Sequence, residues 1–97
     1  MAARFQIVEA FDLPDRGLWV AAGTVVDGNP QMGMSARFED EEDPSFAEPV
    51  HGVELVDPPG DEGTDAYPAL TFHYRDDDKL DAYRSMTWEG RTLLLEW

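Results

Sequence analysis

Apolar and polar residues alternate with a period of two along much of this chain, the pattern of strands with one buried and one solvated face. The alternation is regular in residues 34–38, 70–75 and 93–97. Residues 5–11 keep it except at Glu9, which stands on the apolar face. These four segments are predicted to be strands.

Residues 18–26 and 50–56 carry apolar side chains on both faces. Such a strand is either covered on both sides or interrupted by a bulge that shifts the alternation. Gly23 and Gly52 are the candidate bulge positions, because a glycine inside a strand often marks one. Six strands are therefore predicted in all.

The connections between these strands are polar and rich in glycine and proline, as turns and loops are. Residues 13–17 and 27–30 are predicted to be turns, and the acidic segments 39–44 and 57–65 to be surface loops. Short turns join antiparallel neighbours, so a mostly antiparallel sheet is expected.

One helix is predicted before the last strand, in residues 77–86. Asp77 or Asp78 can cap its first turn, where negative charge also suits the helix dipole. Its apolar residues recur at every third position and form a stripe that can dock on the sheet. The residues of this stripe are Leu80, Tyr83 and Met86.

The chain has 97 residues, enough for one domain with one core, so residues 1–97 are treated as a single unit. Six strands and one short helix define an all-β fold, and the expected closure is a small barrel or a sandwich.

The strongest compositional feature is the acidity of the chain. Twenty-one Asp and Glu residues face seven basic ones, which gives a net charge of −14. This charge repels nucleic acid, and the arginines are scattered instead of forming a basic patch. Three explanations remain: a hydrated coat suited to high salt, a docking surface for a basic partner, or ordinary acidic excess in loops. Abundant Asp with Lys79 as the only lysine favours the halophilic coat.

Compartment and cofactor use are inferred from features that the sequence lacks. It contains no cysteine, so neither a disulfide framework nor thiolate chemistry is expected. Its longest apolar run, residues 18–22, is too short for a membrane span, and the amino terminus does not resemble a signal peptide. We expect a cytoplasmic protein without a cofactor.

Residues 4–34, RFQIVEAFDLPDRGLWVAAGTVVDGNPQMGM, resemble the second domain of translational GTPases, the β-barrel of elongation factor Tu and its relatives. That family has an apolar strand ending in Phe, a glycine turn containing Arg, and a Val-rich strand with evenly spaced glycines. The matching residues are Phe11, Pro14, Arg16, Gly17, Val20, Gly23, Val25, Gly28 and Gly33. The second half of the chain is similar only in rhythm, in HGVELV and WEGRTLLLEW.

The resemblance implies a six-stranded, mostly antiparallel barrel, closed or nearly closed, with the short helix before the last strand. In translation factors this barrel packs on the GTPase domain and helps to hold tRNA or contact the ribosome. The nucleotide-binding domain is absent, because the sequence has no GxxxxGK[ST] motif. Five residues separate Gly17 from Gly23, one more than in the family, which predicts a bulge in the second strand.

No residue is assigned to catalysis, to a metal or to a cofactor. The glycines are interleaved with strand residues, unlike a phosphate-binding loop. The acidic runs lack the spacing of a calcium loop. His51 and His73 have no third partner that would complete a triad or a zinc site. Glu9 is either a buried carboxyl of raised pKa or, as is more common, reaches water where the strand register shifts.

Four residues are candidates for partner contact: Arg16, Trp19, His51 and His73. Arginine is a directional hydrogen-bond donor and tryptophan a large apolar anchor. The alternative for the first two is structural, with Trp19 packed on the barrel and Arg16 paired with a carboxylate. The same two interpretations apply to Trp88 and Trp97, and Trp97 is predicted to cover an open end of the barrel.

Three functions follow from these residues. The first is a non-enzymatic binding or adaptor module that presents barrel loops and an acidic face to a protein partner. The second is an accessory of translation that contacts RNA or the ribosome, against which the net charge argues. The third is a small enzyme with Glu9 or a histidine in the barrel mouth. The oligomeric state is left open.

Overall fold

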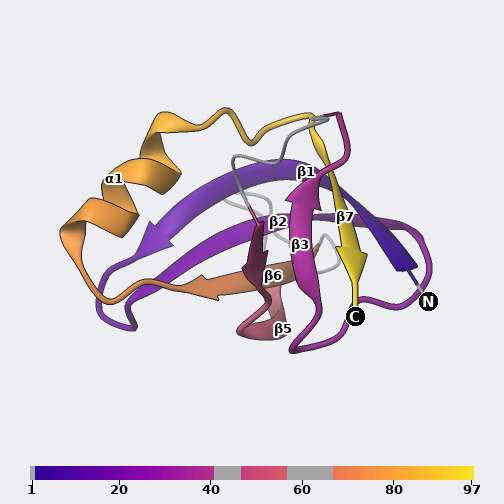
Figure 1. Ribbon diagram of the computed structural model, residues 1–97, viewed down its shortest axis with the longest axis horizontal. Coiled ribbons are helices and arrows are strands. Elements are labelled where there is room, and N and C mark those ends of the chain that lie inside the picture. Colours follow the sequence, from indigo (N-terminus) through magenta and orange to yellow (C-terminus); the bar gives the residue numbers. More distant parts are fainter. Residues whose placement is uncertain (1, 41–46, 57–66) are drawn as a thin grey trace.

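The computed structural model describes residues 2–40, 47–56 and 67–97. This part of the chain forms seven strands and one helix, which precedes the last strand as predicted (Figure 1). The elements are β1 (Ala2–Leu13), β2 (Leu18–Asp27), β3 (Ser35–Phe38), β4 (Ala47–Pro49), β5 (Gly52–Val56), β6 (Tyr67–His73), α1 (Asp77–Ser85) and β7 (Thr92–Glu96). Most of the predicted loop 39–44 and all of the loop 57–65 lie outside the described residues.

All seven strands belong to one antiparallel sheet, in the order β4-β3-β7-β1-β2-β6-β5. The long strands β1 and β2 curve strongly, so the sheet curls into a half-barrel (Figure 1). The all-β, barrel-like prediction is confirmed at this level. The closed six-stranded barrel is wrong, because there are seven strands and no ladder joins β4 to β5 in the described part of the chain.

The extra strand arises where the predicted strand 50–56 meets two different neighbours. The Val50 N–H donates to the Met34 carbonyl oxygen over 2.8 Å, beside β3. The next N–H, that of His51, donates to the Thr71 carbonyl oxygen over 2.7 Å, in β6. Residues 47–49 therefore continue along β3 and residues 52–56 along β6. The chain itself, rather than a ladder, joins the two edges of the sheet at this corner.

The ladder between β1 and β2 contains two irregularities. Val26 of β2 has no opposite residue in this ladder, and neither does Val8 of β1. A Cβ atom at Gly23 would lie 1.9 Å from the Gln6 carbonyl oxygen, so only glycine lets β1 approach there. The bulge predicted in β2 before Gly23 is therefore wrong: the extra residue beside this glycine is Val8, on the opposite strand.

The bulge at Val8 exchanges the two faces of β1. Before it, odd-numbered residues such as Phe5 and Ile7 lie in the main core. After it, Ala10 packs against that core, and Phe11 joins a second cluster on the other face. The buried members of the second cluster are Val20, Ala22 and Ala69. The first part of β2, residues 18–23, is thus covered on both sides, one of the two alternatives that its sequence allows, whereas residues 24–27 are exposed.

The main core is built around Trp88. Its ring lies between 5.1 and 6.1 Å, centroid to centroid, from four other aromatic rings: Trp19, Phe38, Phe72 and Tyr83. Its indole N–H donates to the Tyr83 carbonyl oxygen over 2.7 Å, which satisfies its polar atom inside the core. Of the two interpretations given for Trp88, packing in the barrel and contact with a partner, the structure agrees with packing.

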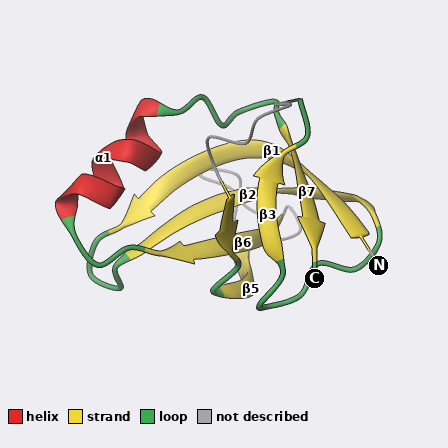
Figure 2. Ribbon diagram, in the orientation of Figure 1, coloured by secondary structure: helices red, strands yellow, loops and turns green. Residues whose placement is uncertain are grey.

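Helix α1 lies at one end of the curled sheet, and both chain ends lie at the other (Figure 2). Its cap is Asp76, whose carboxylate accepts from the Lys79 N–H over 2.9 Å. The predicted caps Asp77 and Asp78 are wrong by one or two positions, because Asp76 is the last residue with extended backbone and the other two already lie in the first turn. In the described part of the chain no helix has the length and apolar content to cross a bilayer.

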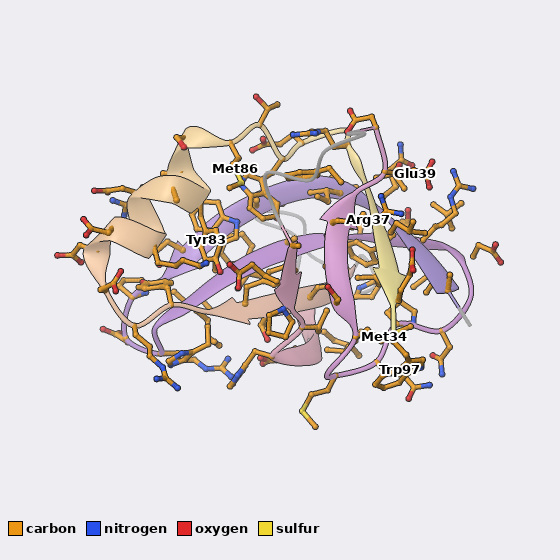
Figure 3. All side chains as sticks on the ribbon, in the orientation of Figure 1. Met34, Arg37, Glu39, Tyr83, Met86 and Trp97 are labelled. Carbon is orange, nitrogen blue, oxygen red and sulfur yellow. The ribbon has the colours of Figure 1, made fainter. Side chains whose placement is uncertain are left out.

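The apolar stripe of α1 faces the sheet as predicted. Leu80 and Tyr83 are buried, and Met86 packs partly buried against the main core. Figure 3 shows Tyr83 between the helix and the strands and Met86 at the helix end nearest β1.

Candidate functional site

Two adjoining hollows lie where α1, the end of β6 and the β4–β5 corner come together. The helix pocket, of about 450 Å³, is lined by His73, Arg75, Asp76, Asp78, Lys79 and Ala82. The corner pocket, of about 280 Å³, is lined by Met32, Gly33, Glu48, Pro49, Val50, His51 and again His73. Because His73 lines both, the two pockets adjoin at this residue, and together we call them the His73 groove.

His51 and His73 lie side by side in this groove. Their ring centroids are 5.4 Å apart and the ring planes are inclined by 31°. Each is held by the sheet: His73 ends β6 opposite Leu18, and the His51 N–H donates to the Thr71 carbonyl oxygen. Both residues are exposed, so the parts of the rings that do not face each other can be reached by a ligand.

An ion pair crosses the groove between its two pockets. The Lys79 ammonium, from the helix pocket, donates to the Glu48 carboxylate, from the corner pocket. The same ammonium lies 5.7 Å above the Tyr83 ring. Burial raises the pKa of the Tyr83 hydroxyl, and the negative charge of Glu48 adds to that rise. This pair connects α1 to β4, although no sequence pattern relates residues 48 and 79.

The electrostatic character of the groove depends on which charges are already paired. Within the described residues, six of the seven basic side chains are paired with carboxylates: Arg4, Arg16, Arg37, Lys79, Arg84 and Arg91. The cation left without such a pair there is Arg75, in the helix pocket. Asp76 and Asp78 line the same pocket, so its carboxylates outnumber its unpaired cation.

Two of the four predicted contact residues lie outside the groove. Arg16 donates two hydrogen bonds of 3.0 Å to Glu54, which ties the first turn to β5 and raises the pKa of Arg16. Trp19 is 6 % exposed and packs in the aromatic core. Its indole nitrogen has no hydrogen-bond partner among the described residues. These placements agree with the structural alternative for both residues.

Glu9 and Trp97 line neither pocket, although the Trp97 ring lies beside Gly33 at the edge of the corner pocket. Glu9 pairs with Ala22 after the β1 bulge, so the register shift that the sequence allowed for is present. Its side chain is partly buried, and one carboxylate oxygen has no partner within the described residues. Trp97 is 69 % exposed, belongs to neither core cluster and lies at the end remote from α1 (Figure 3). The prediction that it covers an open end of the barrel therefore stays a prediction.

The sequence did not point to most of the groove. His51 and His73 are candidates from the sequence, whereas Asp78 is predicted there only as a possible helix cap and Asp76 has no predicted role. In the described ranges, no group of three or more His, Cys, Asp or Glu side chains is arranged to hold a metal ion. The groove thus offers imidazoles, carboxylates and apolar walls as recognition groups.

The sequence matches no protein-family model, and no curated protein or solved structure is significantly similar to the chain. The resemblance to the second domain of translational GTPases therefore stays a prediction.

Proposed function

We propose that this protein is a small non-enzymatic binding module that holds a segment of a protein partner in the His73 groove. The observation that carries the proposal is the junction of two pockets at His73 on a protein with a net charge of −14. Pockets that adjoin along a surface suit an elongated ligand better than a compact one.

The charge of the protein indicates the kind of partner. Within the described residues most basic side chains are neutralised by neighbouring carboxylates, so the acidic excess is left to the surface. Such a field attracts a basic partner, accelerates its association and disfavours nucleic acid. A basic, extended protein segment is the ligand that fits both the shape and the charge.

The enzyme alternative receives less support. Among the described residues that line the two pockets there is no serine, threonine or cysteine that a histidine could activate. Glu9, the other candidate acid, lines neither pocket. The translation alternative still rests on the resemblance alone, and the pairing of six basic side chains leaves few cations for phosphate.

The test is a titration of the isotope-labelled protein with extended arginine-containing peptides, followed by backbone NMR shifts. We expect shifts concentrated in residues 48–51 and 73–79 that weaken as salt is raised. His73→Ala should reduce affinity by about fivefold, the scale of a modest contact residue, while the exposed control Gln6→Ala should not. Shifts spread over the whole surface, or absent at low salt, would overturn the proposal.

A further inference from the structure

We infer that the two pockets read two different side chains of one extended segment: the corner pocket takes an apolar side chain, and the helix pocket takes a basic one. This inference rests on the proposed function, because it assigns a ligand to the same groove. The ligand is a protein segment that carries one apolar and one basic side chain.

The described residues give the corner pocket an apolar wall and no unpaired carboxylate, ammonium or guanidinium group. Met32 is 68 % exposed beside it, and Pro49 and Val50 supply the wall next to the sheet. The one carboxylate among its described lining residues, that of Glu48, is already paired with Lys79. An apolar side chain entering there would cover Met32 and leave no new charge unpaired, whereas a charged one would lose hydration without gaining a partner.

The helix pocket differs because its carboxylates are not all neutralised. Asp76 and Asp78 stand against Arg75, while Lys79 is drawn to Glu48 across the groove. The pocket is the larger of the two, and Ala82 leaves room beside the helix for a long side chain. A lysine or arginine can lay its methylene stem along this wall and place its charge at the carboxylates.

His73 sets the spacing between the two side chains, because it is the wall that both pockets share. In an extended segment, successive side chains point to opposite sides, so two that enter neighbouring pockets on one surface belong to residues i and i+2. The segment would then read apolar–x–basic, or the reverse, with its backbone passing over the two imidazole rings.

The experiment measures the affinity of four peptides for the intact protein by calorimetry. One peptide carries leucine and arginine at i and i+2; in the others serine replaces leucine, glutamine replaces arginine, or an added residue moves the pair to i and i+3. We expect losses of about fivefold to tenfold in each of the three, since each removes roughly 1 to 1.4 kcal/mol of contact energy.

Protein variants then assign each preference to its pocket. Met32→Gln should abolish the preference for leucine over serine and keep that for arginine, and Asp78→Asn should do the reverse. The matched controls are Leu55→Gln, at an apolar residue 73 % exposed on β5, and Asp81→Asn on the same helix; neither residue is among those that line the corner pocket or the helix pocket. The controls should keep both preferences.

Two failures can be told apart by repeating the NMR shift mapping with these peptides. Peptides that shift residues of the His73 groove but bind with equal affinity, or variants that change both preferences together, would overturn the two-pocket assignment and leave the binding module intact. Peptides that shift no residue of the groove would overturn both.

Discussion

The two sides of helix α1 show how differently the molecule is built within a few residues. On one side Leu80 and Tyr83 are 8 % and 1 % exposed and pack into the aromatic core. On the other side Asp78, Lys79 and Ala82 line the helix pocket. The core side is fixed by ring packing, and the groove side by charge.

The two sides also differ in how many elements depend on them. Trp88 contacts rings that come from β2, β3, β6 and α1, so the core side joins most of the fold. The groove side contributes one ion pair, between α1 and β4. A change in the core should therefore act on global stability, and a change in the groove on local contacts and binding.

The largest effect is expected for Trp88→Ala. Removing this ring leaves a cavity among four aromatic neighbours and should reduce the free energy of unfolding by about 3–5 kcal/mol. Urea denaturation measures it, and Trp97→Ala, at a ring 69 % exposed, is the control that should stay within about 0.5 kcal/mol. Equal losses of unfolding free energy in the two variants would show that the buried ring of Trp88 contributes no more to stability than the exposed ring of Trp97.

Gly23→Ala tests whether the core side also needs the close approach of β1 to β2. The added methyl group would meet the Gln6 carbonyl oxygen, so the strands must separate, at a cost of about 1–3 kcal/mol. The neighbouring exposed residue provides the control, Thr24→Ala. Unchanged urea midpoints for Gly23→Ala would mean that the ladder shifts without strain.

A smaller effect is expected on the groove side, for Lys79→Met. The ion pair with Glu48 is partly exposed, with side-chain exposures of 41 % and 23 %, so its loss should cost no more than about 1 kcal/mol. Hydrogen exchange should nevertheless speed up in residues 47–49, because β4 loses its contact with the helix. A loss of unfolding free energy comparable to that of Trp88→Ala would show that the two sides of the helix contribute equally to stability.

The smallest effect at neutral pH is expected for Tyr83→Phe, at the residue that touches both sides. The folded protein holds the pKa of the Tyr83 hydroxyl above its value of about 10 in the unfolded chain. The contribution of this hydroxyl to the free energy of unfolding is therefore fully present below pH 10 and decreases as the pH rises further. Phenylalanine does not titrate, so the variant should lose less stability than the natural chain between pH 9 and 11 in urea midpoints. An equal alkaline loss of stability in the variant and the natural chain would contradict a role for the Tyr83 hydroxyl.

The alternation of the sequence predicted the strands because burial of one sheet face is a local property. Strand β4 was missed because Ala47–Pro49 is too short to show a period. The position of the bulge depends on Gly23 meeting the backbone of Gln6, a contact between strands that no local pattern encodes. The same holds for the groove: Glu48 meets Lys79, and His51 meets His73, only after the sheet has curled.

The two extra residues of the β1–β2 ladder lie on opposite strands, and this constrains how the chain can change in length. The pairing at Arg4 with Asp27 and the pairing at Leu13 with Leu18 keep the same register, because Val8 on β1 compensates for Val26 on β2. Because neither valine has an opposite residue, deletion of either one would leave the existing pairs in place and remove one bulge. The hairpin can therefore lose a residue at either position without a slip of register, so length changes in homologous hairpins should occur there singly as well as in pairs.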